Sequence, residues 1–356
     1  MRRPFEVRIL FSSHVFAPSV GGIETVSALL AEEFVRQGHD VRLITQTAGD
    51  SDLDRRLTIH RKPSVVQQFA LARWCEVFFH NNISLPRAWP LLFLRRPWVV
   101  ANHVWIPQDG LAAKAKRRAM LHATCISASA AIGRDMPAPS TVIPNPYDDS
   151  LFRVLPGVER TRDLVFLGRL VQDKGADLLV TALAKLARRG LRPSVTIIGS
   201  GPEEAALRAQ VSASGLQASV TFVGARRGPE LLALLNQHRF LVIPSRWQEP
   251  FGVVALEGIA AGCVVVASNG GGLPEAVGPC GETFPNGDSD ALASVLARLL
   301  RDPASYEALR QGADRHLRKH TRAQVAAEYL RVITSARPTP AALVPPHSQT
   351  QDAPRV

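Results

Sequence analysis

The sequence is poor in the residues that build disulfide-bonded or membrane-spanning proteins. Its 356 residues include only four cysteines, and none of them stands in a C-x-x-C or similar ligand spacing. This excludes a disulfide framework and a cysteine-based zinc site, and it predicts a protein of the reducing cytoplasm. No apolar run approaches the roughly 20 residues that cross a bilayer. The basic start MRRPFEVRILFSS contains only a short apolar run, which predicts a first strand and no signal peptide.

Aromatic residues are also scarce, at 6%, although the formal net charge is +11. A basic protein of this kind can bind nucleic acid, but no DNA- or RNA-binding motif is present. We therefore expect no nucleic-acid partner. The length suits two domains, and a hydrophobic content of 46% is sufficient for two cores.

The most informative stretch is SRWQEPFGVVALEGIAAGCVVVASNGGGLPE, which spans residues 245–275. The apolar residues 240–243 before it predict a strand buried on both faces, and 263–267 predict a second one. Between them, residues 252–261 contain good helix formers and end at a glycine. The glycines at 270–272 would let the backbone approach a ligand closely.

Two carboxylates, Glu249 and Glu257, flank the start of this predicted helix. The first backbone N–H groups, at Phe251, Gly252 and Val253, carry a partial positive charge that suits a phosphate. A glutamate beside them can bind the hydroxyls of a polyol. The alternative is an ordinary strand–helix–strand unit with two solvent-facing glutamates.

The amino-terminal part predicts a β–loop–α–β unit, with strands at 7–11 and 41–44 and a helix over 23–37. Gly21 and Gly22 precede the helix in a loop too long for a dinucleotide-binding G-x-G-x-x-G motif, which argues against a dehydrogenase. These two glycines form either a phosphate-binding loop or a merely flexible one.

Further apolar runs predict a parallel α/β sheet in this half, at residues 77–79, 98–101, 124–126 and 141–143. His80 and His103 each follow the carboxyl end of such a strand, where open α/β sheets bind their ligands. Each is either a ligand contact or an incidental hydrogen-bonding residue, and His103 is the stronger candidate.

In the second half, Gly168 and Arg169 follow an apolar strand, and Lys174 comes shortly after them. Two cations beyond a strand end can clamp a pyrophosphate, although solvated surface cations are the simpler interpretation. Gly201, in GSGPEE, and Gly224 repeat the pattern of a glycine after a strand. GSGPEE lacks the third glycine of a dinucleotide fingerprint.

The carboxy-terminal part is predicted to be helical over 291–300, 303–320 and 322–335. Asp288-Ser289-Asp290 has the form of a D-x-D metal motif, but its position before a helix favours a helix cap, so we assign no metal ligand. The Pro- and Ser-rich residues 337–356 are expected to be disordered.

Taken together, several motifs resemble the retaining glycosyltransferases of family 4, which share the GT-B fold. These motifs are E-x7-E with Pro-Phe-Gly after the first Glu, GRLVQDKG, GSGP, GGGLPE, and GGIE followed by a helix and GHDV. The resemblance covers residues 5–335. It implies an α/β protein with two Rossmann-like domains facing a central cleft. These would be an acceptor-side domain over 1–150 and a donor domain over 151–320, with a helix at 321–336 packing back on the first domain.

The resemblance also implies roles for the candidate residues. Arg169 and Lys174 would neutralise the leaving diphosphate, and Glu249 would bind hydroxyls of the transferred sugar. Glu257 would bind the ribose, and His103 would contact the sugar near its reacting face. Gly21 and Gly22 would let the first loop close over the phosphates. Gly224 would lie in the part that lines the nucleotide base pocket, and Gly168 and Gly201 would also belong to the donor site.

The expected function is therefore transfer of a sugar, with retention, from a nucleotide diphosphate sugar to a saccharide or lipid-linked acceptor, in cell-surface polysaccharide or glycolipid synthesis. No cofactor is expected besides this donor substrate, and no catalytic nucleophile is assigned. An epimerase or hydrolase on the same fold, and a non-catalytic nucleotide-sugar-binding protein, remain alternatives. The sequence does not encode the base, the sugar or the acceptor. It also departs from the family at Asn145-Pro146-Tyr147-Asp148, where Asn-Gly-Val-Asp is usual, so the hinge or an acceptor contact can differ.

Finally, residues 84–118 contain seven Lys and Arg against one acid, Asp109. Apolar residues alternate with these cations; they are Trp89, Leu91, Leu92, Phe93, Leu94 and Trp98. The stretch is either a buried segment beside a solvated helix face, or a docking surface for an anionic membrane. The second interpretation would place a cytoplasmic protein peripherally on the inner face of the cytoplasmic membrane.

Overall fold

The computed structural model describes residues 6–19 and 21–338, and it contains two parallel sheets. The first has seven strands in the order β3-β2-β1-β4-β5-β6-β7. These strands are β1 (Arg8–Ser13), β2 (Asp40–Thr45), β3 (Thr58–Arg61), β4 (Val77–Asn81), β5 (Trp98–Asn102), β6 (Thr124–Ser127) and β7 (Ser140–Val142). The second has six strands in the order β10-β9-β8-β11-β12-β13. Its strands are β8 (Arg162–Leu167), β9 (Val195–Ile198), β10 (Val220–Gly224), β11 (His238–Ile243), β12 (Val264–Ser268) and β13 (Gly281–Phe284).

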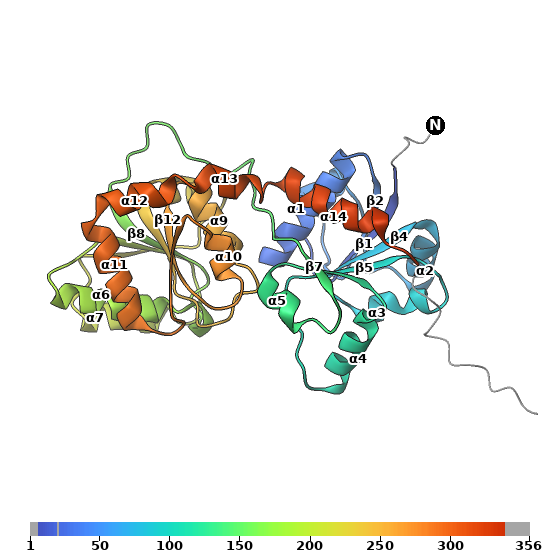
Figure 1. Cartoon of the computed structure of the whole chain (residues 1–356), viewed down its shortest axis with the longest axis horizontal. Helices are drawn as coiled ribbons and strands as arrows, with labels where there is room; N and C mark the ends of the chain where they lie inside the picture. The colour runs from blue at the N-terminus through green and yellow to red at the C-terminus, as the bar shows by residue number, and fades with distance from the viewer. Residues whose placement is uncertain (1–5, 20, 339–356) are drawn as a thin grey trace, which may run out of the picture.

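Helices cover both faces of each sheet (Figure 1). Those connecting strands of the first sheet are α1 (Gly22–Arg36), α2 (Val65–Trp74), α3 (Leu85–Ala88), α4 (Leu111–Met120) and α5 (Ala130–Asp135). Those that follow are α6 (Ala176–Arg188), α7 (Glu204–Ala213), α8 (Gly228–Asn236), α9 (Val253–Ala260), α10 (Leu273–Val277), α11 (Ser289–Arg301), α12 (Pro303–Arg310), α13 (Ala313–Arg318) and α14 (Arg322–Ser335). Short 3₁₀ turns lie at η1 (Asp52–Arg55), η2 (Trp89–Leu92) and η3 (Gln172–Lys174). We call the first sheet with α1–α5 and α14 the first lobe, and the second sheet with α6–α13 the second lobe.

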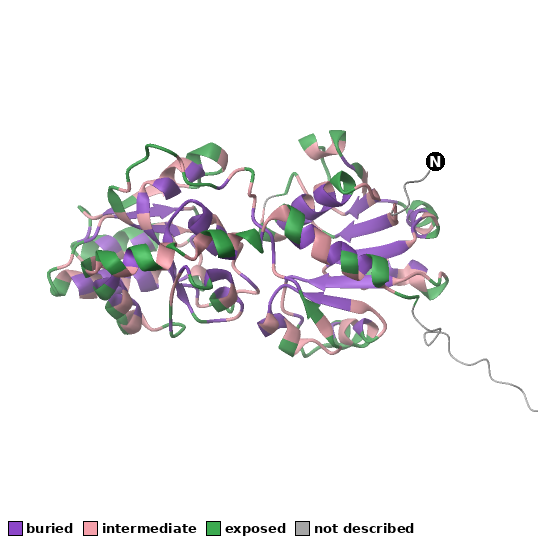
Figure 2. Cartoon of the chain, turned by 45° about the horizontal axis from the view of Figure 1, so that its top comes forward, coloured by how far each residue is buried: buried purple, intermediate pink, exposed green. Residues whose placement is uncertain are grey.

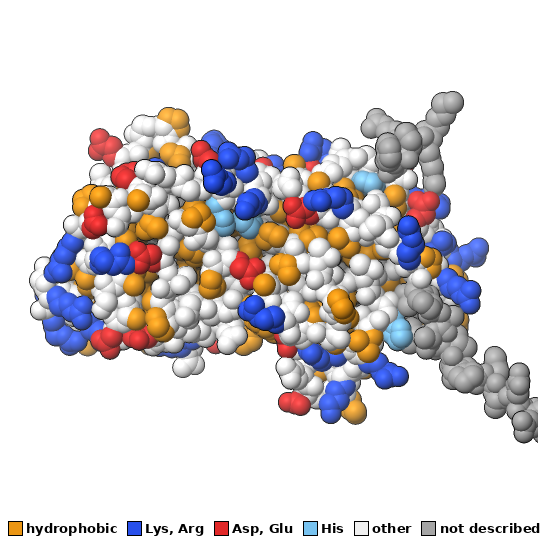
Figure 3. Space-filling view, viewed as in Figure 1, with side chains coloured by type: hydrophobic (Ala, Val, Ile, Leu, Met, Phe, Trp, Pro, Cys, Tyr) orange, Lys and Arg blue, Asp and Glu red, His pale blue; other side chains and the backbone are white. Residues whose placement is uncertain are grey.

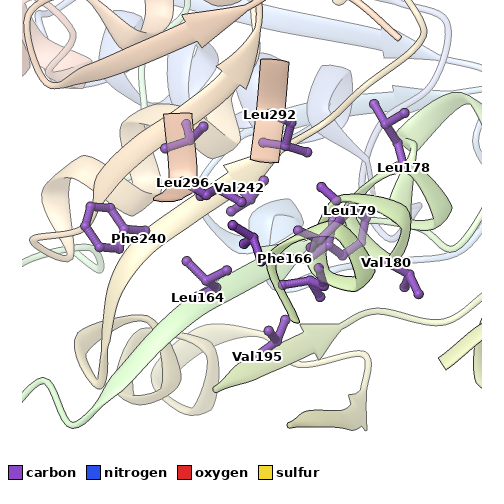
Figure 4. Close-up of a cluster of buried hydrophobic side chains, with 14 of the residues drawn as sticks. Leu164, Phe166, Leu178, Leu179, Val180, Val195, Phe240, Val242, Leu292 and Leu296 are labelled. Carbon is purple, nitrogen blue, oxygen red and sulfur yellow. The ribbon is translucent and has the colours of Figure 1, made fainter. Parts of the chain in front are cut away.

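The central strands form because their apolar residues are buried on both faces, as parallel sheets require (Figure 2). In the second lobe, one face packs Leu164, Phe166 and Phe240 against α6 and α11 (Figure 4). The opposite face packs Val165 and Leu241 against α8, α9 and α10. Alternate residues of one strand therefore enter different cores.

The first sheet follows the same rule. Phe11 and Phe79 face a core shared with α1, while Trp98 and Val100 face the opposite core near α4. Trp98 is only 5% exposed, so it cannot enter a membrane interface as the sequence analysis suggested. Its aromatic ring is part of the core because β5 is buried on both sides.

The carboxy-terminal helices differ from the prediction in one place. The helix predicted over 303–320 is two helices, α12 and α13, separated at Gln311-Gly312. A Cβ at Gly312 would lie 3.0 Å from the ring of Pro279, so the chain turns where it passes close to the segment that follows α10. Glycine is also the weakest helix former apart from proline.

The last helix, α14, returns to the first lobe (Figure 1). Five of its side chains are buried in the core that contains Phe11; they are Val325, Ala326, Tyr329, Leu330 and Ile333. Beyond it, Pro338 forms an isolated bridge with Pro97. The rest of the tail expected to be disordered, 339–356, lies outside the described residues. Within the described residues, no helix is both long and apolar enough to cross a membrane.

Candidate active site

The two loops that contain the predicted donor site meet where the winding of the second sheet reverses. β8 and β11 are neighbours in this sheet, and the chain leaves them toward opposite edges. Open α/β sheets bind ligands beside the carboxyl ends of strands at such a point. Residues 168–175 follow β8 and residues 244–252 follow β11. Their position, rather than their sequence alone, identifies them as a candidate site.

A charged pair joins these loops. Lys174 Nζ lies 2.5 Å from Glu249 Oε1, and the Ser245 hydroxyl donates to the same oxygen at 2.9 Å. The side chains of Lys174 and Glu249 are 28% and 13% exposed, so the pair is sheltered but reachable. The structure therefore brings together the cation predicted for the diphosphate and the carboxylate predicted for the sugar.

Backbone contacts hold the two loops in register. Gly175 has φ +67°, and a Cβ there would lie 2.0 Å from the Pro244 carbonyl oxygen. The N–H of Trp247 donates to the Asp173 carbonyl at 3.1 Å. The Arg246 guanidinium binds both carboxylate oxygens of Asp177 in the first turn of α6. The sequence analysis missed this last pair, because 69 residues separate its members.

Arg169 is exposed and has no hydrogen bond or ion pair among the described residues. It therefore remains available to a ligand. Gly168 donates its N–H to Ile198 O at 3.1 Å, which fixes the loop beside β9. A Cβ at Gly201 would lie 2.3 Å from the Leu170 carbonyl oxygen, so this glycine has a packing role of its own. Gly224 ends β10 with φ +71°, a conformation that favours glycine.

Helix α9 begins beside this pair. Phe251 is buried, and Gly252 has φ +105° with Leu273 2.5 Å from the position of an added Cβ. Val253 starts the helix and contacts the cores of both lobes. Burial, together with the nearby carboxylate of Asp148, raises the pKa of Glu257 to about 7. Glu257 is half-buried, and its carboxyl group has no hydrogen bond or ion pair among the described residues.

The glycine cluster at 270–272 approaches protein backbone. A Cβ at Gly271 would lie 2.1 Å from the Glu249 carbonyl oxygen, and one at Gly272 would lie 2.5 Å from that of Pro250. The cluster was expected to let the chain approach a ligand. In the structure, its lack of side chains lets it pack directly under the loop that contains Glu249.

Gly21 and Gly22 lie at the amino terminus of α1 in the first lobe. Gly21 is extended, with φ −176°, and an added Cβ would lie 2.5 Å from the Glu24 carboxylate. Nothing lies within 4 Å of an added Cβ at Gly22. The space beside Gly22 is open, whereas no hydrogen bond of the described residues joins either glycine to Lys174 or Glu249.

His103 is buried, and side-chain amides engage both of its ring nitrogens. Asn81 donates its NH₂ to Ser27 Oγ at 2.6 Å, and its Oδ1 lies 2.6 Å from His103 Nε2. The side-chain amide of Asn145 lies 2.7 Å from Nδ1. Burial lowers the pKa of His103 to about 4, so its ring is neutral near pH 7. A neutral ring donates from one nitrogen only, so it donates either to Oδ1 of Asn81 or to Oδ1 of Asn145, which faces Nδ1.

His80, the weaker candidate, is a core residue. Trp98 Nε1 donates to its Nδ1 at 2.8 Å, and burial lowers its pKa to about 3. Asp288 caps α11 by accepting from the N–H groups of Asp290 and Ala291, which confirms the prediction of a helix cap. In the part of the chain that the structure describes, no three His, Cys, Asp or Glu side chains form a group that could hold a metal.

The fold and this site together define a GT-B glycosyltransferase architecture. The crystal structure of Anabaena HepE in complex with UDP and glucose superposes with a TM-score of 0.76 at 20% identity, over 93% of this chain and 100% of that one. The sequence profile described as Glycosyl transferases group 1 matches residues 149–316, and that of Glycosyltransferase Family 4 matches residues 20–151. The chain belongs to glycosyltransferase family 4.

Two curated relatives are similar over part of the chain. The glycogen synthase of Mycobacterium tuberculosis (strain CDC 1551 / Oshkosh) is 36% identical over 181 residues, which are 50% of this chain and 44% of the relative. A GDP-mannose-dependent alpha-(1-6)-phosphatidylinositol monomannoside mannosyltransferase of Mycolicibacterium smegmatis is 34% identical over 154 residues, 41% of this chain and 40% of the relative. The chain thus matches less than half the length of these relatives.

Proposed function

We propose that the protein transfers a sugar from a nucleoside diphosphate sugar to an acceptor hydroxyl, with retention of configuration at the anomeric carbon. The observation that carries the proposal is the Lys174–Glu249 pair at the reversal of the second sheet, beside the start of α9. In this proposal the second lobe, over residues 151–320, binds the donor, and the first lobe over 1–150 presents the acceptor. The helix at 321–336 belongs structurally to the first lobe.

The chemistry follows from the groups present. The bond between the anomeric carbon and the diphosphate oxygen breaks, and negative charge develops on the diphosphate. Lys174 and Arg169 stabilise that charge, and the N–H groups at residues 251–253 add the partial positive charge of a helix start. The acceptor oxygen bonds to the anomeric carbon, and its proton passes to an oxygen of the leaving diphosphate.

Glu249 and Glu257 would bind hydroxyl groups. Lys174 and Ser245 orient the Glu249 carboxylate. The carboxylate is therefore preorganised to accept hydrogen bonds from hydroxyls of the transferred sugar. Glu257 has free acceptor capacity for the ribose. The names of similar proteins support this assignment, because they include a structure of HepE in complex with UDP-glucose and a GDP-mannose-dependent enzyme.

The test is a two-step screen of UDP-, GDP- and ADP-sugars. A bound donor raises the melting temperature in proportion to its affinity, so thermal shifts identify the donor class first. The selected donor is then incubated with saccharide and lipid-linked acceptors, and the anomeric configuration of the product is read by NMR. Transfer with retention supports the proposal. Conversion or hydrolysis of the donor without an acceptor would identify an epimerase or hydrolase, and binding without turnover would identify a binding protein.

We also propose a lipid-linked acceptor presented at an anionic membrane surface. Helix α4 exposes Leu111 and ends at an exposed Leu121, with Lys114 and Arg118 exposed between them. Leu92 and Phe93, after α3, are exposed too, Phe93 by 72%. Basic side chains gather over the part of the surface where α4 lies (Figure 3). On such a surface the Lys and Arg side chains would bind anionic lipid headgroups, and the exposed apolar side chains would enter the boundary between headgroups and acyl chains.

Liposome sedimentation tests this surface. Binding should require anionic lipid and weaken steeply with salt, because each Lys or Arg near such a surface contributes about 1 kcal/mol. Replacing Lys114, Lys116 and Arg118 with Glu should abolish binding. Arg117 is kept, because it bonds to Asp135 and helps to hold α5. Absence of binding to anionic liposomes at low salt would favour a soluble acceptor instead.

A further inference from the structure

Three consecutive carbonyl groups around Glu249 each accept a hydrogen bond. Gly272 N–H donates to the carbonyl of Glu249 at 2.7 Å, from within the second lobe. The flanking carbonyls accept from side chains of the first lobe. Trp105 Nε1–H donates to Gln248 O at 2.7 Å, and the Ser129 hydroxyl donates to Pro250 O at 2.6 Å. The loop that orients Glu249 is thus held from both lobes.

The two first-lobe donors lie at the same edge of their sheet. Trp105 follows β5 and Ser129 follows β6, and these strands are neighbours. Ser129 is fully buried and also caps α5, accepting from the N–H of Ile132 at 3.2 Å. The N–H of Ala130 donates to the carboxylate of Glu275, at 2.9 and 3.0 Å. The first lobe therefore contacts the second at fixed points around the Glu249 loop.

We propose that Trp105 and Ser129 are positioning residues that couple closure of the two lobes to the placement of Glu249. Their donors reach Gln248 O and Pro250 O only when the lobes are closed as in the structure. The loop then has its backbone fixed immediately before and after Glu249. When the lobes separate, both carbonyls lose these partners, and the loop around Glu249 is then held only by second-lobe groups, those of Lys174, Ser245 and Gly272.

This inference rests on the proposed function, and its consequence is specific. A donor bound to the second lobe alone would find the diphosphate cations in place, whereas the backbone around the sugar-binding carboxylate would lack its two first-lobe hydrogen bonds. Donor affinity should therefore depend little on Trp105 and Ser129, while turnover of the bound donor should depend on both. A residue that merely supports the fold would change stability without separating these two quantities.

The leading experiment is Trp105→Phe in the full chain, which keeps an aromatic ring and removes the N–H. We expect kcat to fall about 3- to 10-fold, the ratio that corresponds to loss of one net hydrogen bond. The donor KM should stay within about twofold, since contacts with the nucleotide are unchanged. Trp74→Phe is the matched control, because Trp74 lies in the first lobe under the Arg42 guanidinium, away from the Glu249 loop. It should leave kcat unchanged.

Ser129→Ala is the second variant, with Ser64→Ala as its control. Both substitutions remove a helix cap in the first lobe, but Ser64 caps α2 and, among the described residues, makes no hydrogen bond to the second lobe. Only Ser129→Ala should lower kcat. Because Trp105 and Ser129 act on one loop, the double variant should deviate from the product of the single effects. Equal kcat losses in Ser129→Ala and Ser64→Ala would overturn the role of Ser129.

Hydrogen–deuterium exchange of the peptide covering 246–252 makes the test independent of catalysis. Trp105→Phe should speed exchange in this peptide several-fold, and Trp74→Phe should not. Unchanged exchange together with unchanged kcat would overturn the inference. If no donor supports transfer, the proposed function fails, and the exchange result alone decides whether the first lobe holds this loop.

Discussion

The carboxyl edges of the two sheets both contain polar side chains, but of opposite character. In the second lobe they are charged and partly exposed, and Lys174 pairs with Glu249 across two loops. In the first lobe, the polar side chains of His103, Asn81 and Asn145 are buried and bond to one another. A polar side chain at a strand end can therefore bind a ligand directly only if a ligand can reach it and replace its present hydrogen-bond partners. Lys174 and Glu249 of the second lobe meet this condition. The buried cluster around His103 does not meet it in this conformation.

The comparison predicts that substitutions in the second lobe mainly affect turnover. Lys174→Ala and Arg169→Ala should each lower kcat by about 10² or more, the cost of removing one charge-stabilising donor. The free energy of unfolding should change by about 1 kcal/mol or less for Lys174→Ala, because its pair is partly exposed.

Lys185→Ala is the matched control for Lys174→Ala. Lys185 lies in the same lobe and also pairs with a carboxylate, that of Asp290 at 2.7 Å, but on α6 and α11. Its loss should leave steady-state kinetics unchanged. Normal kinetics in Lys174→Ala and Arg169→Ala would show that the site lies elsewhere.

Substitution in the first-lobe cluster should instead affect stability. His103→Ala would remove the ring from the buried amide oxygens of Asn81 and Asn145, so the free energy of unfolding should fall by about 2 kcal/mol. Urea unfolding measures this, and His14→Ala, at an exposed histidine, should be nearly neutral. A stable His103→Ala protein with strongly reduced kcat would instead place His103 at the sugar, as the family resemblance implies.

Glu257 sharpens the comparison, because it lies in the second lobe and is half-buried, between the partly exposed Lys174 and the buried first-lobe cluster. Its pKa near 7 lies above the ordinary value of 4.5, so the folded state favours the protonated form. The stability that this group contributes is greatest below its ordinary pKa and is lost as pH rises through about 7.

Donor affinity should show the opposite trend if the carboxylate accepts from ribose hydroxyls. It should rise about tenfold between roughly pH 6 and pH 8, because the ionised fraction rises about tenfold across a pKa near 7. Glu257→Gln should bind more weakly at high pH and show a nearly flat profile. Calorimetric titration of the donor at several pH values measures both. A wild-type profile as flat as that of the variant would contradict the ribose contact.

The smallest expected effect is that of a chelator. Because Lys174 and Arg169 supply positive charge that a metal supplies in other enzymes, excess EDTA should leave the rate within about twofold. Loss of activity that Mg²⁺ or Mn²⁺ restores would show that these cations are not sufficient.

Much of the fold was predictable because its central strands are continuous apolar runs, such as Leu241–Ile243 and Val264–Ala267. The edge strands β3 and β13 were missed, because they are short and carry half-exposed polar residues. Neither of these two strands contains the continuous apolar run on which the strand predictions were based. The split between α12 and α13 was missed because a single glycine in a helical pattern is often tolerated.

The site residues that could be predicted are those that lie close together in the sequence. Glu249 and Glu257 share one short stretch, and Arg169 and Lys174 share another, so each set could be named from the sequence. Trp105, Ser129 and Glu275 could not, because their partners lie more than a hundred residues away; the Trp105–Gln248 contact, for example, spans 143 residues. The partners of His103 are equally invisible in the sequence, since Asn145 reaches it from the segment between the lobes.

The return of α14 to the first lobe also constrains how the protein is made. The ribosome synthesises β1 through β7 first. The core around Phe11 and Phe79 is nevertheless incompletely packed until Tyr329 and Ile333 of the last helix have been synthesised. The second lobe has its own cores and can fold earlier. The part synthesised first is therefore completed last. A nonsense codon anywhere before position 322 would release a chain whose first lobe has an uncovered apolar face, a substrate for chaperones and proteases rather than a partly active enzyme.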